Sequence, residues 1–270
     1  MLTQIDHLVI ISPDLDTAVA RAGHAGFSSV RGGTHADGLT ENALIAFADG
    51  SYIELISPTR PDLGADHRWF DRLRHGGGLV DFCLLSDDLE ADMTAMREKG
   101  VDYVGPSALG RNPPNGERID WLLGLPHGNV GGTGWPFLIE DTTPRSLRVP
   151  HEESEITHPN GATGIAGVVV LVHNLESASS DYQTMLGSEA MEIPSPIAGG
   201  GRAVQVPIGA AGTQWIVLVQ PLGGEQAWRS EALGQGPYAA TLRTHDGEVA
   251  PGDGAPIDPP LHADARLLLA

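Results

Sequence analysis

Two ionisable residues stand inside segments that are otherwise almost wholly apolar. His7 lies in 5-IDHLVIIS-12, and Glu54 lies in 52-YIELIS-57. Side chains alternate between the two faces of a strand, so each of these residues shares a face with apolar neighbours two positions away. An ionised carboxylate buried in such a strand costs several kcal/mol unless it is paired or bound to a metal. Glu54 therefore needs a partner.

Two explanations account for this pair. A histidine and a carboxylate that face one cavity suit Zn, Fe, Ni or Mn, and their spacing does not choose among these metals. In the alternative without a metal, His7 hydrogen-bonds a backbone carbonyl in the core and Glu54 pairs with a nearby arginine. Residues 5, 7, 9 and 11 share one strand face, and so do residues 52, 54 and 56, so both side chains can face one cavity.

The strand around His7 begins a pattern that recurs along the chain. An apolar run is followed by Asp or Asn, then Leu and a polar stretch, in three segments: 5-IDHLVIISPDLDTA-18, 79-LVDFCLLSDDLEAD-92 and 165-IAGVVVLVHNLESA-178. The pattern predicts a buried strand and then a helix whose N-cap is Asp14, Asp88 or Asn174. Each helix is expected to end at a glycine in the left-handed conformation, namely Gly26, Gly100 and Gly187.

Further apolar or alternating runs follow each predicted helix. They predict strands at 43–48, 51–57, 118–124, 136–140, 202–208 and 214–221, with one short strand directly after each helix. Each repeat is thus a βαβββ module, and a fourth copy from 236 onward lacks its capped helix and ends in a closing strand at 264–270. The segment 144–161 has the composition of a linker. We expect an α+β fold with domains at 1–145 and 160–270, and with the helices on the convex side of each sheet.

Composition excludes several classes of function. The net charge of −19 repels phosphate backbones and anionic surfaces, so neither nucleic acid nor a membrane is an expected partner. No run of apolar residues is long enough to span a bilayer. The single cysteine, Cys83, forms no intrachain disulfide, and a reducing, cytoplasmic location is expected. The glycine run at 76–78 lacks the Lys and Ser or Thr of a phosphate loop, so no nucleotide cofactor is expected.

Paired βαβββ modules around a shared cavity resemble the vicinal oxygen chelate superfamily, which includes glyoxalase I and the extradiol dioxygenases. More narrowly, 32-GGTHADGLTENALIAFADGSYIELIS-57 is similar to glyoxalase-like domain proteins, in which a GG-x-H, a T-x-N and a Y-x-E-L follow one another. The segment 158-HPNGATGIAGVVV-170 is similar to the same proteins. The resemblance covers nearly the whole chain.

The resemblance assigns roles to several residues. It implies that His7 and Glu54 are metal ligands, since the first strand of a module commonly gives a His and its last strand a Glu. It makes His35, Thr40 and Asn42 candidates for contacting substrate or completing a metal shell, although Asn and Thr side chains also hold turns. Two aromatic residues are further candidates for lining the substrate cavity, with packing in the core as the alternative: Tyr52 and Trp121.

The partner module matches this ligand set only in part. Aligning the strands puts Asp81 opposite His7 and Phe137 opposite Glu54, so Asp81 is a candidate third ligand. The same alignment puts Gly167 and Val217 at the two positions in the third module. The second domain is therefore expected to hold no such site and to support the first or mediate self-association, with a homodimer as our expectation.

Two functions are compatible with these residues. The first is an enzyme of lyase, isomerase or dioxygenase type that acts on a small oxygenated metabolite through a divalent metal. The second is a metal-free protein of the bleomycin-resistance type, which binds or sequesters a small molecule without turnover. The incomplete ligand set favours the second, and the His7 and Glu54 pair favours the first.

Overall fold

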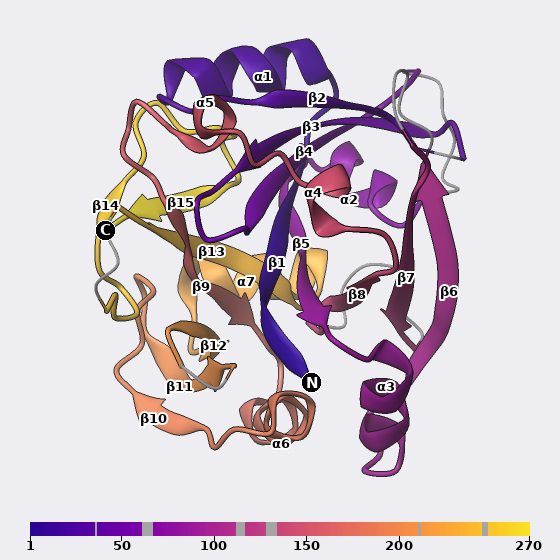
Figure 1. The fold of residues 1–270 in the computed structure, drawn as a ribbon. Coiled ribbons are helices and arrows are strands. Elements are labelled where there is room, and N and C mark those ends of the chain that lie inside the picture. Colours follow the sequence, from indigo (N-terminus) through magenta and orange to yellow (C-terminus); the bar gives the residue numbers. More distant parts are fainter. Residues whose placement is uncertain (36, 61–66, 112–116, 128–133, 210–211, 245–247) are drawn as a thin grey trace.

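The computed structural model describes residues 1–35, 37–60, 67–111, 117–127, 134–209, 212–244 and 248–270. Within them the chain forms an eight-stranded sheet in the order β2-β3-β4-β1-β5-β8-β7-β6 and a seven-stranded sheet in the order β10-β11-β12-β9-β13-β15-β14 (Figure 1). The strands of the first sheet are β1 Leu2–Ile11, β2 Val30–Thr34, β3 Thr40–Ala46, β4 Tyr52–Pro58, β5 Gly78–Ser86, β6 Tyr103–Arg111, β7 Ile119–Pro126 and β8 Phe137–Asp141. Those of the second are β9 Gly164–Leu171, β10 Met191–Ile193, β11 Gly201–Ile208, β12 Gln214–Pro221, β13 Gly236–Arg243, β14 Ala255–Pro256 and β15 Arg266–Leu269. The helices are α1 Leu15–His24, α2 Phe70–Arg74, α3 Leu89–Arg97, α4 Arg145–Arg148, α5 Glu153–Ile156, α6 Leu175–Leu186 and α7 Gly224–Leu233.

The three repeated helices begin and end where the sequence predicts. The side chains of Asp14, Asp88 and Asn174 accept hydrogen bonds from the amides of Thr17, Ala91 and Ser177, at 2.7, 3.0 and 2.9 Å. Each bond satisfies an amide of the first turn that has no partner within the helix. The predicted terminal glycines, Gly26, Gly100 and Gly187, have φ of 81°, 88° and 63°, which glycine adopts at little cost.

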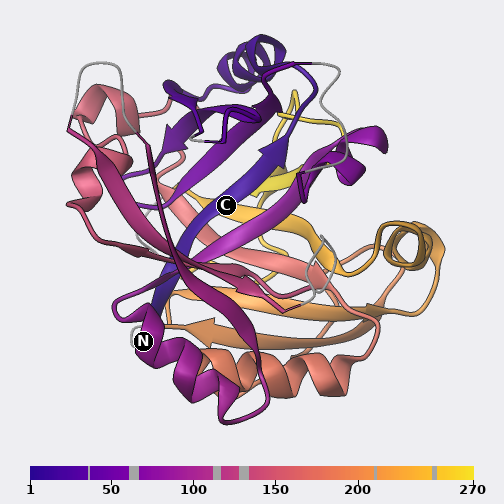
Figure 2. The ribbon, with the colours of Figure 1, turned by 90° about the vertical axis from the view of Figure 1, so that its right-hand side faces the viewer.

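Alternate residues of the strands face two different apolar environments. Leu8 and Ile10 of β1 belong to a large core that also contains Leu15 of α1 and, from the second sheet, Val168 and Leu218. This core lies between the outer faces of the two sheets, and Figure 2 shows α3 and α6 side by side along one of its edges. The opposite, concave face of the first sheet carries a separate, smaller cluster. The α+β fold with tandem βαβββ modules and helices on the convex sides is therefore confirmed.

Strand register relates the modules to one another. Val9 pairs with Glu54, Cys83 with Phe137, and Val169 with Val217, and the first residue of each pair lies at the same distance before its helix N-cap. Phe137 and Val217 therefore occupy the position of Glu54 in modules two and three. The alignment made from the sequence agrees with this pairing.

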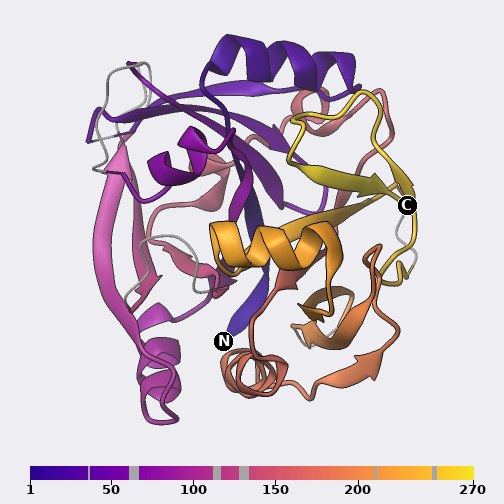
Figure 3. The same ribbon diagram turned by 180° about the vertical axis from the view of Figure 1, so that it is seen from behind.

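The concave face of the second sheet is filled by its own chain. The indole of Trp215 lies over Gly167, where an added Cβ would be 2.1 Å from the ring, and its Nε1 donates to the carbonyl of Val249 at 2.8 Å. Helix α7, which the sequence did not predict, lies across this side of the sheet (Figure 3). As expected, the fourth module is degenerate, and its closing strand β15 pairs in parallel with β13.

The segment between the two sheets is more ordered than its composition suggests. It contains α4 and α5, and Arg148 at the end of α4 is buried against the first sheet. His158 is also buried: its Nε2 donates to the carbonyl of Ala46 at 2.9 Å, and its Nδ1 accepts from the amide of Ser28 at 3.1 Å. The division into domains at 145 and 160 stays a prediction. Among the described residues, no helix is both long and apolar enough to cross a membrane.

Candidate functional site

The concave face of the first sheet encloses a cavity of about 360 Å³. Strands β1, β3, β4, β7 and β8 contribute to its walls, together with the β2–β3 turn and residues 67–69 before α2. The apolar part of the wall includes Leu123, Leu125 and Ile139. Of the residues predicted from the sequence, seven line it: His7, His35, Thr40, Asn42, Tyr52, Glu54 and Trp121.

The carboxylate of Glu54 is the centre of the polar part of this cavity. Its Oε1 accepts a hydrogen bond from Asn42 Nδ2 at 2.6 Å and lies 3.3 Å from His35 Nε2, while its Oε2 lies 3.7 Å from His7 Nε2. The pairing of β3 with β4 makes Asn42 a diagonal neighbour of Glu54 on one face of the sheet. The short hairpin that joins β2 to β3 brings His35 back over the same carboxylate.

Both imidazoles are fixed through their other ring nitrogen. His7 Nδ1 lies 2.6 Å from Asp6 Oδ1, and His35 Nδ1 lies 2.7 Å from Thr40 Oγ1. Burial alone would raise the pKa of Asp6, but the charge of Arg148, with contributions from His7 and Arg145, holds it well below its ordinary value. An ionised Asp6 only accepts hydrogen bonds, so His7 Nδ1 carries the proton and donates it. His7 Nε2 is then directed at Glu54.

The charges of this group stabilise one another. Burial alone would raise the pKa of Glu54, but the hydrogen bond and charge of His35, the charge of His7 and the hydrogen bond from Asn42 lower it to about 2. Burial alone would lower the pKa of His35, but its hydrogen bond and attraction to Glu54 raise it. Glu54 is therefore ionised at neutral pH although its side chain is buried.

Aromatic rings hold the imidazole of His7 on two sides. Tyr52 stacks on it with ring centroids 4.5 Å apart and an interplanar angle of 13°, and Phe137 meets it edge-on at 5.2 Å. The hydroxyl of Tyr52 in turn accepts a hydrogen bond from Arg148 Nη1 at 2.8 Å. Tyr52 lines the cavity as predicted, and it also fixes the plane of a candidate ligand.

Arg148 anchors this arrangement from outside the predicted site. Its two Nη atoms donate to Asp6 at 3.0 and 2.9 Å, and its Nε donates to Asp141 at 2.5 Å. Asp6 therefore links His7 to an arginine 142 positions away in the chain. The sequence signal was an aspartate directly beside His7 in a buried strand, but nothing in the segment 144–161 marks Arg148 as its partner.

Asp81 is placed differently from the other predicted ligands. Its Oδ2 accepts from Trp69 Nε1 at 2.9 Å and lies 3.3 Å from Arg68 Nη2, and its Oδ1 accepts from the amide of Phe82 at 2.9 Å. Both oxygens are thus engaged by groups other than His7 and Glu54. Burial raises the pKa of Asp81 despite the charge of Arg68. Its role as a third ligand stays a prediction.

A second group with ligand-type atoms lies beside His7. Atoms of Asp6, His7 and Cys83 lie within 4.8 Å of one another, all buried. Two arginines already pair with Asp6, and His7 Nδ1 donates to it. Burial raises the pKa of the Cys83 thiol well above its ordinary value, so the thiolate that a metal requires is disfavoured. The set around Glu54 is the better candidate.

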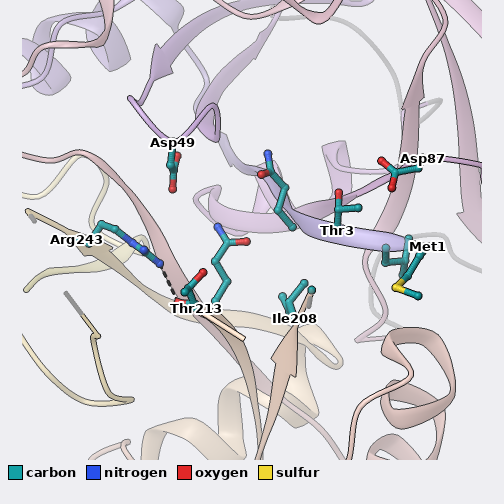
Figure 4. Close-up of a pocket in the computed structure, with 11 residues that line it drawn as sticks. Met1, Thr3, Asp49, Asp87, Ile208, Thr213 and Arg243 are labelled. Atoms are coloured by element: carbon teal, nitrogen blue, oxygen red, sulfur yellow. Dashed lines mark hydrogen bonds between the residues drawn. The ribbon is translucent and has the colours of Figure 1, made fainter. Parts of the chain in front are cut away.

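Another cavity, of about 450 Å³, lies where the start of β1 meets the second sheet (Figure 4). Its polar groups serve the backbone: Arg243 Nη2 donates to the carbonyl of Thr213 at 2.9 Å, and Gln214 bonds the amide of Ile5 and the carbonyl of Ile165. The bond between Ile5 and Gln214 joins β1 to the second sheet, and the other two lie within the second sheet. The cavity is therefore a feature of the packing between the two sheets.

Comparison with known proteins places the chain in a family. A family model described as "Glyoxalase-like domain" matches residues 5–186. No curated protein matches the chain. Among solved structures, a hypothetical protein from Staphylococcus aureus is similar over 100% of both chains, with a TM-score of 0.69 and 15% identity.

Two further structures are similar to the chain. One is a mutant of 4-hydroxymandelate synthase from Streptomyces coelicolor, with a TM-score of 0.63, 14% identity and coverage of 91% of this chain and 72% of that one. The other is a xylose isomerase-like TIM barrel/4-hydroxyphenylpyruvate dioxygenase fusion protein, with a TM-score of 0.56, 15% identity and coverage of 91% and 37%. At these identities the likeness shows the fold. Because the family match spans more than half of the chain, the protein belongs to the glyoxalase-like domain family of the vicinal oxygen chelate superfamily.

Proposed function

We propose that the protein is an enzyme that holds a divalent metal between His7, His35 and Glu54 and acts on a small oxygenated metabolite in the cavity of the first sheet. One observation carries the proposal. Two imidazole Nε2 atoms face the two oxygens of one ionised carboxylate, at 3.7 and 3.3 Å. Because Asp6 engages His7 Nδ1, Nε2 is the ring nitrogen left to bind a cation beside the carboxylate.

The residues around these three fit a metal site. Metal-binding histidines usually have their second nitrogen fixed by a carboxylate or another oxygen, as Asp6 fixes His7 and Thr40 contacts His35. Two histidines and one carboxylate suit Fe, Zn, Mn or Ni, and this set is the one used by many non-haem Fe(II) oxygenases. The fit therefore supports the proposal and leaves the metal open.

The chain's own residues would position the substrate and the ligands. When bound, the metal would supply Lewis acidity to carbonyl, enolate or vicinal oxygens of the substrate. Asn42 holds the carboxylate of Glu54 in place, and the stacked ring of Tyr52 fixes His7. Apolar side chains such as Leu123 and Ile139 would exclude water from the reacting groups. Isomerase, lyase and dioxygenase chemistry are all compatible with this arrangement.

One observation favours a second candidate function. Phe137 stands where the partner module would supply the counterpart of Glu54, and Asp81 is engaged by Arg68 and Trp69. The partner module thus gives no free ligand among these residues. In this alternative the protein binds a small molecule without a metal, and Glu54 serves as an acceptor held by Asn42 and His35.

Metal analysis of untagged protein tests the first proposal against the second. We expect one metal ion per chain, reduced to background in His7→Ala and kept in the control His24→Ala, whose histidine is exposed on α1. Protein that stays metal-free after exposure to Fe, Zn, Mn and Ni salts, with an unchanged unfolding midpoint, would contradict the metal proposal. A cytoplasmic location and a homodimer are further proposals, which fractionation and sedimentation would test.

A further inference from the structure

The cavity contains an arginine that the proposed metal site does not use. Arg68 precedes α2, and its guanidinium carbon lies 4.4 Å from the ring centroids of both Trp69 and Phe137. The two rings hold the guanidinium in place on the cavity wall. Its position is therefore set before any ligand enters.

The hydrogen bonding of Arg68 is incomplete. Nη2 lies 3.3 Å from Asp81 Oδ2, but Nη1 is buried and has no hydrogen-bond partner in the described part of the chain. Buried donors on charged groups are nearly always paired in native proteins. Asp81 is also shared with Trp69 Nε1 and the amide of Phe82. Arg68, which lines the cavity, thus keeps one donor that no described residue satisfies.

Other charges that line the cavity are distributed in favour of an anion. Arg148 is matched by Asp6 and Asp141, whereas Arg111 donates, among the described residues, to the backbone carbonyls of Gly32 and Arg148. Glu54 faces the two histidines, and Asp37 is exposed. A metal at Glu54 would add positive charge. The cavity therefore favours a negatively charged ligand.

The rest of the cavity wall is apolar, and it fits an apolar body attached to the charged group of the ligand. Strand β7 presents the alternate residues Trp121, Leu123 and Leu125 to the cavity. The neighbouring strands β6 and β8 add Leu109 and Ile139. The volume, about 360 Å³, is at the small end of the range of small-molecule sites. A compact ligand with one charged end matches both parts.

From this geometry we infer that the substrate is a small carboxylate with an apolar body, and that Arg68 Nη1 donates to the carboxylate. A planar guanidinium matches a carboxylate oxygen in both charge and direction. The inference deepens the proposed function, on which it rests in placing the substrate in the same cavity. It names a specificity residue, Arg68, that belongs to no part of the proposed metal shell.

Binding of matched pairs of probes tests this inference. Phenylacetate and hexanoate would each be compared with the corresponding neutral amide by calorimetry, with Trp69 fluorescence as a second readout. In the wild type we expect each carboxylate to bind at least tenfold more tightly than its amide. In Arg68→Met this ratio falls at least fivefold, with the remainder due to Arg111 and any bound metal, and in Arg68→Lys it lies between. The control Arg74→Met, which changes an exposed arginine of α2, keeps the wild-type ratio.

The outcomes separate this inference from the proposed function. Metal content is measured in the same preparations, and Arg68→Met is expected to keep it. A metal-free wild type that still discriminates through Arg68 would overturn the metal proposal and leave the carboxylate inference standing. A wild type that does not prefer carboxylates, an Arg68→Met variant that keeps the wild-type ratio, or tighter binding of phenyl phosphate than of phenylacetate would each overturn the inference.

Discussion

Replacing Arg148 by Met should destabilise the protein and loosen the candidate metal site together. Arg148 is buried and donates two hydrogen bonds to Asp6, two to Asp141 and one to Tyr52. Removing one partner of a buried ion pair costs about 3–5 kcal/mol, because the other charge stays buried without compensation. Arg145 also pairs with Asp6 and would keep part of that compensation. We therefore expect a loss near the lower end, about 3 kcal/mol.

Urea unfolding followed by circular dichroism measures this loss. The control Arg74→Met removes an exposed ion pair and should change the free energy of unfolding by less than about 0.5 kcal/mol. A double-mutant cycle with Asp6→Asn isolates the contact between Asp6 and Arg148, and we expect a coupling of about 2 kcal/mol. Metal affinity should fall roughly 10–100-fold in Arg148→Met, because Asp6 orients His7.

Three results would each refute a part of this reasoning. A loss of stability below about 1 kcal/mol would show that Arg145 alone satisfies Asp6, so that Arg148 is not an anchor. A coupling near zero in the double-mutant cycle would show that Arg148 stabilises the fold through Asp141 or Tyr52. Unchanged metal affinity, with the expected loss of stability, would show that His7 keeps its orientation without Arg148.

Three further predictions concern other parts of the chain. Gly167→Ala should lower the free energy of unfolding, measured in urea, by about 1–3 kcal/mol or more, because the new Cβ would overlap the Trp215 ring. The control Gly23→Ala on α1, where nothing lies within 4 Å of the added Cβ, should be neutral or stabilising. Burial lowers the pKa of His158 in the folded state, so the unfolded state binds the proton more readily. The stability that His158 contributes is therefore present above pH 6.5 and is lost as the pH falls through its folded pKa. His158→Gln should therefore flatten the decline in stability between pH 7 and 5, and an unchanged decline would contradict this. Asp81→Asn tests the candidate third ligand: both oxygens of Asp81 are engaged by other groups, so we expect the metal content of the protein to stay unchanged, and a loss of metal would show that Asp81 is a ligand.

Much of the fold could be predicted from the sequence because the signals are local. The capping side chains Asp14, Asp88 and Asn174 and the glycines that end the helices act within a few residues, and strand alternation follows from the backbone alone. Helix α7 was missed because the residues that it buries, Gln226, Arg229 and Ser230, are polar, and because it begins at two glycines. Its place is decided by the sheet face that it covers.

The candidate site could be predicted only where it lies in regular strands. His7 and Glu54 stood out as ionisable residues in apolar strands, and the register of β1 with β4 brings them to one face. Arg68 and Arg148 come from segments with the composition of loops, whose destination depends on the whole fold. Asp81 lies in a regular strand, and yet its surroundings could not be predicted. Alignment gives the position of its backbone but not the partners that engage its side chain.

The second sheet shows how the same module serves without a site. In module one Tyr52 pairs with His7 across β1 and β4, and its ring stacks on the imidazole. In module three Trp215 pairs with Gly167 at the same register, and the larger indole fills the volume that an imidazole would need. With Val217 in the place of Glu54, the register positions of the site carry no charge, and apolar side chains such as Val169, Val217 and Val219 pack together on this face. Glycine, tryptophan and valine thus act as one set, since a histidine at 167 would meet the indole and a glutamate at 217 would lack both His35 and Asn42.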